Sequence, residues 1–444
     1  MYNILEFGAV CDKNINSTKA FQSAIDECKE AGGGIVYIPY GEYTLGTVHL
    51  CSDLHLIFEP GAKIYGSLDV DDFDEREAVN YPLFQDASHS YFNRSMFVAK
   101  NCDNITLSGY GTIDMREVWE KEPIKGEAEW GSRRAAKIFT FKECNDIVIS
   151  DLTLLHSTDL ALYLVGCKRA KVRNMTFEVN MDAISPDCCE NVIISDCIIK
   201  SGDDGIVIKS SYALNKKIQS ENIVVTNCTV SSRASAIKLG TESNGGYKNI
   251  AISNCTIHDT CLGGVSLEIT DGGDLDGITV SNITMDNVSY PFFVILSDRR
   301  RGPEGTQMGT LKNIVINNIT AVGPYHKWKA PIMTHLQDPD SLAECFIRPS
   351  TFTGQPDRKI ENISLSNIFI TVPGGEGEEN KTVILPEITH DYPEAYQFGN
   401  EFPTYGMFFR HVKNLTLNNV RIDTIAPDGR NPFVFDDVEN FKIF

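Results

Sequence analysis

A short β-like phrase recurs along the chain from about residue 104 onward. Its copies begin at residues 104, 145, 191, 222, 249, 277, 313, 362 and 414 and read, for example, NIVVTNC at 222 and NIAISNC at 249. The starts at 191, 222, 249 and 277 are separated by 31, 27 and 28 residues, within the range of stacked solenoid units. Hairpin repeats would need two-residue turns between the runs, and a propeller would need a period nearer ~40–45 residues. The repeat predicts an all-β fold, a right-handed parallel β-helix, as a single domain over residues 1–444.

The corner after each run carries an Asn that can bond to its copy in the next coil. These residues are Asn227, Asn254, Asn282, Asn318 and Asn367. The next position is Cys in some copies and Ile in others, which indicates an apolar environment. The 13 cysteines lack the CxxC pairs of a zinc site and the density of a small secreted scaffold, so we expect them to be reduced, buried and structural.

A helix is expected to cover the N-terminal end of the core, within a cap and first coils at 1–50. Asn16 or Ser17 can begin it and the glycines at 32–34 can end it. Its apolar face would comprise Ala20, Phe21, Ala24, Ile25 and Cys28. The segments 115–133, 297–310, 324–358 and 371–405 break the period and are predicted to be long loops, the last within a C-terminal insertion at 371–410.

Acidic residues outnumber basic ones, 60 to 40, which gives a net charge of −20. This charge disfavours nucleic acid and anionic membranes as partners. The start MYNILEFGAV has no basic leader, and no stretch approaches ~18 uninterrupted apolar residues, so we expect a cytoplasmic protein. The expected partner is an oligosaccharide, no metal or other cofactor is expected, and the sequence does not indicate an oligomeric state.

Three carboxylates are concentrated in a strand-like part of the chain. Asp203 and Asp204 lie in the sequence GDDG, and Asp182 precedes Asp203 by 21 positions. Hydrolysis of a glycosidic bond uses one protonated acid and one carboxylate that directs water, and repulsion between close carboxylates raises the pKa of at least one of them. The alternative is that GDDG forms a simple turn, because Asp and Gly favour left-handed and Asx conformations.

The chain resembles glycoside hydrolase family 28, the polygalacturonase family, over nearly its whole length. Its opening at 7–50 resembles the start shared with other β-helix polysaccharide enzymes. Asn180-Met181-Asp182, followed by SPD and then by GDD at 202–204, resembles the family's Asn-Thr-Asp and Asp-Asp motifs, with Met181 in place of Thr. The resemblance implies that Asp203 is the general acid, and that Asp182 and Asp204 hold the attacking water in an inverting displacement.

Two other motifs of the family differ in this chain. The Gly-His-Gly motif falls at 233–235, where Ala234 replaces the histidine, and the Arg-Ile-Lys motif falls at Ser266-Leu267-Glu268. In polygalacturonases that Arg and Lys are implied to bind a galacturonate carboxylate. Glu268 would repel a uronate and could accept hydrogen bonds from neutral sugar hydroxyls. The candidate substrate-binding residues are Asn180, Lys209, Arg233, Lys238, Glu242, Glu268, Tyr163, Arg299, Arg301 and Tyr405.

Several of these candidates have a simpler interpretation. The run at 299–301 could be a solvated loop, and Tyr163 is a weak candidate. Residues 392–417 resemble a C-terminal stretch of bacterial, often exo-acting, family members, in which Tyr405, Arg410 and His411 could line a subsite or simply pack. The three tryptophans of the aperiodic segments could stack on a sugar face; they are Trp119, Trp130 and Trp328.

The first hypothesis is an inverting, exo-acting glycoside hydrolase that trims pectin-like or neutral oligosaccharides derived from plant polysaccharides. Its acid and the nearer base carboxylate are predicted to lie about 6.5–9.5 Å apart, whereas about 5 Å would favour a covalent intermediate. The second is a polysaccharide lyase or sugar transferase. A lyase would need Ca²⁺ or another cation and a basic residue, and the acid triad argues against it. The third is a non-catalytic glycan-binding β-helix, which the retention of all three acids disfavours.

Overall fold

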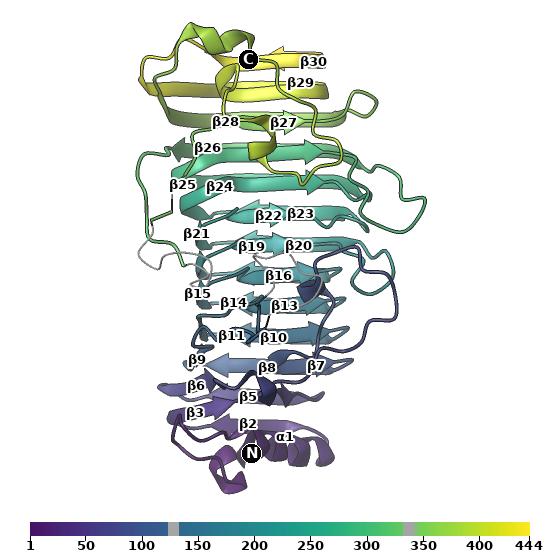
Figure 1. Ribbon diagram of the computed structural model, residues 1–444, viewed down its shortest axis with the longest axis vertical. Coiled ribbons are helices and arrows are strands. Elements are labelled where there is room, and N and C mark those ends of the chain that lie inside the picture. The colour runs from purple at the N-terminus through teal and green to yellow at the C-terminus, as the bar shows by residue number, and fades with distance from the viewer. Residues whose placement is uncertain (123–132, 332–341, 344) are drawn as a thin grey trace. The chain divides into compact units, whose positions relative to one another are not determined.

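The computed structural model describes residues 1–122, 133–331, 342–343 and 345–444 (Figure 1). It divides into two compact units, which are described one at a time. The first consists mainly of Met1–Asp203, and the second mainly of Asp204–Tyr212, Lys217–Ala330 and Asp340–Phe444. In the described part of the chain, no helix is long and apolar enough to cross a membrane.

The first unit is built from coils of three short strands that stack in parallel. One stack contains β2 (Gly34–Ile38), β5 (Leu54–Phe58), β8 (Asp103–Gly109), β11 (Asn145–Ser150), β14 (Lys168–Arg173) and β17 (Glu190–Ser195), with β1 (Tyr2–Asn3) beside β2. A second contains β3 (Gly41–Leu45), β6 (Ala62–Gly66), β9 (Thr112–Asp114), β12 (Thr153–Leu155), β15 (Thr176–Val179) and β18 (Ile198–Ser201). The third contains β4 (Val48–His49), β7 (Ser95–Lys100), β10 (Lys137–Lys142), β13 (Leu162–Val165) and β16 (Ile184–Asp187).

The helix α1 (Thr18–Glu30) lies at the N-terminal end of the first unit, as the sequence predicts. The side chain of Asn16 accepts a hydrogen bond from the backbone N–H of Thr18, while Ser17 instead accepts one from Val10. The five predicted apolar residues are its buried residues. Gly32, with φ of 87°, then takes a left-handed conformation that favours glycine and ends the helix.

The second unit uses the same parallel stacking, and its strands from β24 onward, apart from β27, are longer. One stack contains β19 (Ile206–Ile208), β22 (Ile237–Leu239), β24 (Thr256–Ile269), β25 (Asp274–Leu296), β27 (Ser350–Thr353), β29 (Thr404–Ala426) and β30 (Asn431–Ile443). β20 (Ser220–Thr226), β23 (Tyr247–Ser253), β26 (Thr310–Val322) and β28 (Ile360–Gly374) stack with β25 and β29 along a second side, and β21 (Thr229–Ser232) pairs with β24. β25 and β29 each run through a corner and take part on two sides.

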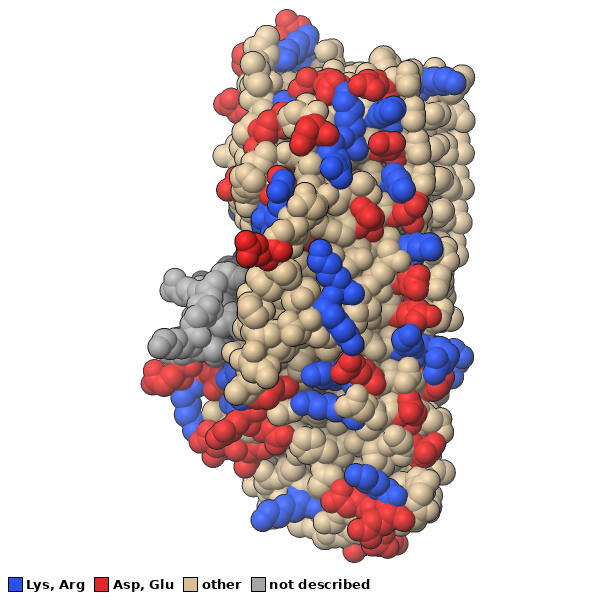
Figure 2. All heavy atoms as spheres, turned by 90° about the vertical axis from the view of Figure 1, so that its right-hand side faces the viewer, with Lys and Arg blue, Asp and Glu red and all other residues tan. Residues whose placement is uncertain are grey.

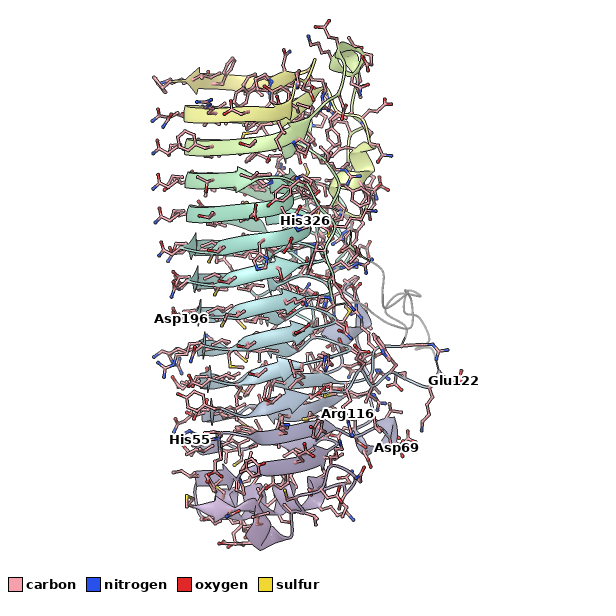
Figure 3. The ribbon with its side chains drawn as sticks, turned by 90° about the vertical axis from the view of Figure 1, so that its left-hand side faces the viewer. His55, Asp69, Arg116, Glu122, Asp196 and His326 are labelled. Atoms are coloured by element: carbon pink, nitrogen blue, oxygen red, sulfur yellow. The ribbon has the colours of Figure 1, made fainter. Side chains whose placement is uncertain are left out.

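The asparagine ladder predicted from the repeat is present in the second unit. Side-chain amides bond from Asn254 through Asn282, Asn318 and Asn367 to Asn419, at 2.8–3.2 Å per step. Each of these residues has φ between 52° and 56°, a left-handed corner that Asn tolerates better than most residues. In the first unit, Asp196 occupies the equivalent left-handed position after β17 and is labelled in Figure 3.

The all-β class and the right-handed parallel β-helix are confirmed. Four details differ from expectation. The interval from 145 to 191 holds two coils, because β14 lies between β11 and β17. The predicted loop at 324–358 contains β27, and an additional long connection runs from β6 to β7. All 13 cysteines are free and 11 are buried, but Cys11 is exposed and Cys345 is partly exposed.

Candidate functional site

Asp182 and Asp203 come together in the first unit because they follow two paired strands. β15 and β18 are parallel neighbours, so the residues after their C-terminal ends lie side by side. Carboxylate oxygens of Asp182 and Asp203 lie within 4.8 Å of each other. Gly202 makes this approach possible, since a Cβ there would lie 2.6 Å from the carbonyl oxygen of Asn180. The backbone at 202–205 has no left-handed residue, which argues against a simple Asp-Gly turn.

The predicted separation of about 6.5–9.5 Å is not found between the nearest oxygens of Asp182 and Asp203, which are within 4.8 Å. The prediction assumed that an acid and a base flank both the sugar and a water molecule. The strand pairing instead places the two carboxylates at adjacent strand ends, where the spacing between strands, about 4.8 Å, sets their distance.

Arg134 is a cation of the first unit that the sequence analysis missed. It is buried, and its Nη1 donates to Ser88 Oγ at 2.7 Å. Burial opposes its charge, but the carboxylates of Asp159, Asp203, Asp86 and Asp182 together raise its pKa. Arg134 therefore supplies positive charge to the Asp182–Asp203 pair. It follows a segment predicted to be a loop, and nothing in the local sequence distinguishes it from a solvated arginine.

Two further predicted residues lie in the first unit. Asn180 is buried, and its Nδ2 donates to Glu117 Oε1 at 3.3 Å, while its role in substrate binding stays a prediction. Tyr163 is fully buried, and its hydroxyl donates to the His89 carbonyl at 2.9 Å and contacts Asp187 at 3.0 Å. The prediction of Tyr163 as a sugar-binding residue is wrong, because the tyrosine packs in the interior with its hydroxyl engaged there.

Asp204 is the first residue of the second unit and directly follows Asp203 in the chain. Its Oδ1 accepts a hydrogen bond from the backbone N–H of Ser235 at 2.9 Å. Its Oδ2 lies 3.6 Å from Lys238 Nζ. The carboxylate is therefore oriented by the segment in which Ala234 replaces the histidine of the resembling motif, so the substitution leaves Asp204 with partners.

Lys238 lies at the centre of a buried group of carboxylates, which we call the Lys238 cluster: Asp204, Lys238, Glu268 and Glu394. The Lys238 side chain is 3% exposed, and its Nζ lies 3.4 Å from Glu268 Oε2 and 3.2 Å from Glu394 Oε1. Burial opposes the charge of Lys238, but Asp204 and Glu268 raise its pKa well above the usual range. Burial raises the pKa of Glu268 well above its usual range, with the charges of Glu394 and Asp204 adding to the effect and Lys238 opposing it.

The insertion between β28 and β29 supplies Glu394, which the sequence analysis did not select. Apolar residues of this insertion pack on the strands; they are Leu385, Ile388, Ala395, Phe398 and Phe402, against Tyr290, Phe293, Ile295 and Phe408. Tyr392 of the same segment lies with its ring 5.9 Å from Lys238 Nζ. The apolar packing thus fixes an acidic loop over a buried lysine.

Glu242 and Asp271 bind three of the predicted cations in a second buried network. Glu242 contacts Lys209 at 3.3 Å and Arg301 at 2.6 Å, and Arg299 makes a bidentate pair with Asp271 at 2.8 and 2.5 Å. Burial raises the pKa of Asp271, although Arg299 opposes this. Arg299 and Arg301 are thus not a solvated run, since their charges are used by buried acids. Arg300 alone of the three pairs at the surface, with Asp298.

Arg233 differs from the other predicted cations. It is partly exposed, and among the described residues it has no carboxylate partner. Trp328 packs in a cluster with Cys261, Ala330 and Ala343, so it is unsuited to stacking on a sugar. Trp119 is partly exposed and pairs through its backbone with Arg134, whereas Trp130 lies outside the described residues.

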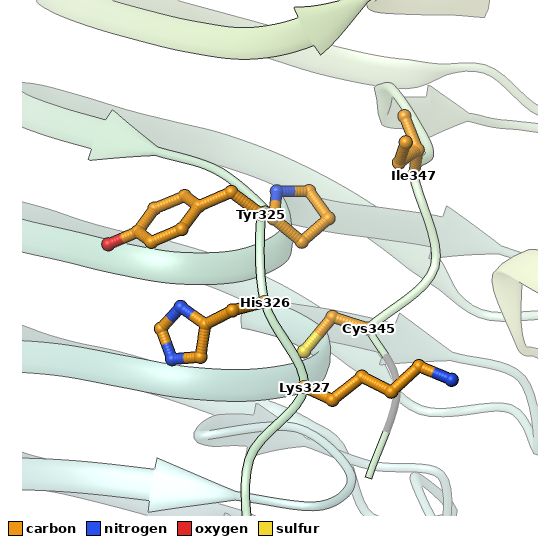
Figure 4. A pocket seen from close by; sticks show the side chains of 6 residues that line it. Tyr325, His326, Lys327, Cys345 and Ile347 are labelled. Atoms are coloured by element: carbon orange, nitrogen blue, oxygen red, sulfur yellow. The ribbon is translucent and has the colours of Figure 1, made fainter. Parts of the chain in front are cut away.

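Tyr405 is the second residue of β29 and has no described contact with the Lys238 cluster. Arg410 and His411, further along that strand, pair with Asp436 and Asp437 at 2.8 and 2.7 Å, so they pack rather than line a subsite. A separate pocket of about 250 Å³ is lined by residues 324–327, Cys345 and Ile347 (Figure 4), and Figure 3 also labels its His326. There Cys345 Sγ lies 3.5 Å from Cys261 Sγ.

Oxygen ligands suited to a divalent cation are present at Asp182 and Asp203, because hard cations prefer carboxylates. The same atoms carry the predicted acid–base chemistry, so removal of metal ions distinguishes metal binding from acid–base catalysis.

On the face of the molecule drawn in Figure 2, acidic and basic side chains are intermingled.

Comparison with known proteins places these features in a family. The family model described as "Glycosyl hydrolases family 28" matches residues 28–330. A probable polygalacturonase of Vitis vinifera is 25% identical over 383 residues, covering 83% of this chain and 74% of that protein. The structure of a family 28 exopolygalacturonase from Yersinia enterocolitica matches 99% of this chain and 78% of that chain, with a TM-score of 0.75 and 17% identity. An exopolygalacturonase from Thermotoga maritima matches 83% and 86%, with a TM-score of 0.67 and 18% identity.

Proposed function

Since the chain belongs to glycoside hydrolase family 28, and is therefore a glycoside hydrolase acting on O-glycosyl bonds, we propose that it releases sugar units from the ends of pectin-derived oligosaccharides by an inverting displacement. The observation that carries the proposal is the close approach of Asp182 and Asp203 after two paired strands, with Asp204 next in the chain. In this assignment Asp203 protonates the leaving oxygen, and Asp182 and Asp204 hold the attacking water.

The charges of the first unit support sharing of one proton between Asp182 and Asp203. Two carboxylates within 4.8 Å repel each other, so the singly protonated pair is favoured over the doubly ionised one. Arg134 stabilises the negative charge that remains on the pair. Asp203 is the more exposed of the two, which suits the acid that must reach a leaving group.

Action at chain ends is supported by the insertion between β28 and β29. Its apolar residues pack on strands of the second unit, and it carries Tyr392 and Glu394 to Lys238, whose Nζ lies 3.6 Å from Asp204 Oδ2. A polysaccharide that extended past Asp204 in the second unit would collide with this segment. Long loops on a rigid scaffold usually set such limits on substrate shape.

A cytoplasmic location is part of the same proposal. Its support is the 13 free cysteines, including Cys261 and Cys345, whose sulfurs lie 3.5 Å apart without a bond. Disulfides persist in oxidising compartments and are rare in the cytosol.

The proposal is tested by reducing-end release from a panel of uronic, neutral and mixed oligosaccharides, with product sizes followed in time and product anomers assigned by NMR. Single units released from the first time point, with inverted configuration and loss of release in Asp203→Asn, are expected. A product with retained configuration would instead indicate a covalent intermediate, which the short distance between the carboxylates would then explain. Activity that EDTA abolishes would assign the acids to a metal site.

A further inference from the structure

Four ionisable groups of the second unit are buried together around one ammonium group. The exposed fractions of the side chains are 3% for Lys238, 8% for Asp204, 0% for Glu268 and 6% for Glu394. One positive charge therefore faces three carboxyl groups at 3.2–3.6 Å. If all were ionised the cluster would carry a net negative charge in the protein interior, which is strongly unfavourable.

Burial raises the pKa of Glu268 and Glu394, the two glutamates of the cluster. An ionised carboxylate accepts hydrogen bonds and a protonated carboxyl group also donates one, so either form can bind a neutral hydroxyl.

Hydrogen-bonding capacity is left over in the same place. Among the described residues, both carboxyl oxygens of Glu268 and Oε2 of Glu394 have no hydrogen-bond partner, although Lys238 lies near. The hydroxyl of Tyr290, on β25, is likewise buried and unpartnered. Unpartnered buried polar atoms are costly and rare, and a ligand that satisfies them removes that cost.

We propose that the Lys238 cluster is a specificity site that accepts a neutral sugar unit through its hydroxyl groups and rejects a uronate. This inference rests on the proposed glycosidase function and names the substrate class of the site. A sugar hydroxyl can both donate to and accept from Glu268 and Glu394. A uronate carboxylate would add a further negative charge beside three carboxyl groups.

The opposing interpretation is that Lys238 binds a uronate carboxylate, as the missing Arg and Lys would. Lys238 is unsuited to this because its charge is already shared among Asp204, Glu268 and Glu394. Lys209, Arg299 and Arg301 are engaged by Glu242 and Asp271. A uronate elsewhere in the substrate could still be met by Arg233.

Access to the cluster depends on the insertion. Glu268 is fully buried, and Tyr392 and Glu394 lie against Lys238. The segment that carries them has no β-strand between Gly374 and Thr404. A sugar that reaches Glu268 would therefore enter between this segment and the strands of the second unit, where Glu394 also contacts it.

The test compares hydrolysis of trigalacturonate with hydrolysis of oligosaccharides in which a neutral hexose or 6-deoxyhexose adjoins a galacturonate. The wild type should cleave the mixed substrate with a kcat/KM at least about 100-fold higher, since like charges brought together cost several powers of ten in affinity. Glu268→Gln keeps the shape and removes the ionisable group. It should lower the ratio of the two kcat/KM values at least tenfold by raising kcat/KM for trigalacturonate. Asp271→Asn in the second network should leave this ratio unchanged.

Trigalacturonate cleaved within tenfold of the mixed substrate would overturn the inference. So would a Glu268→Gln variant that lowers both activities in parallel, because that is the effect of a merely structural residue. Binding to the Asp203→Asn protein, measured by calorimetry with the same oligosaccharides, keeps the two proposals apart. Hydrolysis of no substrate by the wild type refutes the proposed function, whereas tighter binding of trigalacturonate to Asp203→Asn refutes the neutral-sugar site.

Discussion

Replacement of Lys238 by Met removes the one cation of the Lys238 cluster and leaves three buried carboxyl groups. Nζ contacts them at 3.2–3.6 Å, and the lysine side chain is 3% exposed. Breaking a buried ion pair by removing one partner costs about 3–5 kcal/mol, because the remaining charge is uncompensated. We therefore expect Lys238→Met to lower the free energy of unfolding by about 3–5 kcal/mol at pH 7.

The pH dependence of this loss follows from the raised pKa of Glu268 and Glu394. A carboxyl whose pKa is higher in the folded than in the unfolded protein binds its proton more tightly when folded, so stability rises as pH falls toward the unfolded value of 4.5. Without Lys238 both pKa values should rise further. The difference in stability between Lys238→Met and the wild type should accordingly shrink between pH 7 and pH 5.

The assay is urea unfolding followed by tryptophan fluorescence at both pH values. Lys168→Met is the matched control, because Lys168 pairs with Glu190 at 2.9 Å but the two side chains are 53% and 32% exposed. Such a surface pair contributes about 0–1 kcal/mol. A Lys238→Met variant that loses no more than the control, or whose deficit grows toward pH 5, would refute the description of the cluster as a buried, charge-compensated group.

Four further outcomes are expected. Asp203→Asn should lower kcat by about 10²–10⁴-fold without changing the thermal midpoint by more than a few degrees, as measured by initial rates and calorimetry. Arg134→Met should shift the acid limb of the pH–rate profile to higher pH, because the carboxylates near Arg134 then hold their protons more tightly; an unchanged limb would remove Arg134 from the site. Diamide should join Cys261 to Cys345 as a disulfide detectable by peptide mass spectrometry and absent in Cys345→Ser, since their sulfurs lie 3.5 Å apart. Arg233→Met should raise KM for uronate-bearing substrates and leave KM for neutral ones unchanged, whereas equal effects on both would assign Arg233 to packing.

The fold could be predicted because every copy of the sequence repeat meets the same physical requirement. Each coil needs inward apolar residues and a corner that tolerates a left-handed backbone, and the runs ending in Asn254, Asn282 and Asn318 satisfy both. β14 was missed because its sequence KRAKVR buries just Ala170 and Val172, so its alternation is weak on its own. Its position is fixed by pairing with β11 and β17, and these contacts cannot be predicted from the sequence of β14 alone.

The candidate site could be predicted in part. Asp182 and Asp203 were found because their chemistry and their place after strands are both visible in the sequence. Glu394 was missed because it lies 156 positions from its partner Lys238 and reaches it through the packing of an insertion. Tyr163 was selected wrongly because the sequence of a strand does not show whether an aromatic residue faces a cleft or the interior.

The pairing of the cations, however, was open to prediction from the coil length. Residues one coil apart lie beside each other, and the clean repeats have steps of 27 to 31 residues. Asp271 precedes Arg299 by 28 positions and Lys209 precedes Glu242 by 33, as the observed pairs show, and Glu268 follows Lys238 by a similar interval. Buried cations need such partners, so an acid one coil away predicts a structural charge. One coil after Arg233 stands Cys261, and the structure gives Arg233 no carboxylate partner within its described residues. By this criterion Arg233, among the five cations predicted to bind substrate, is the one that remains available to an anionic group of the substrate within the described residues.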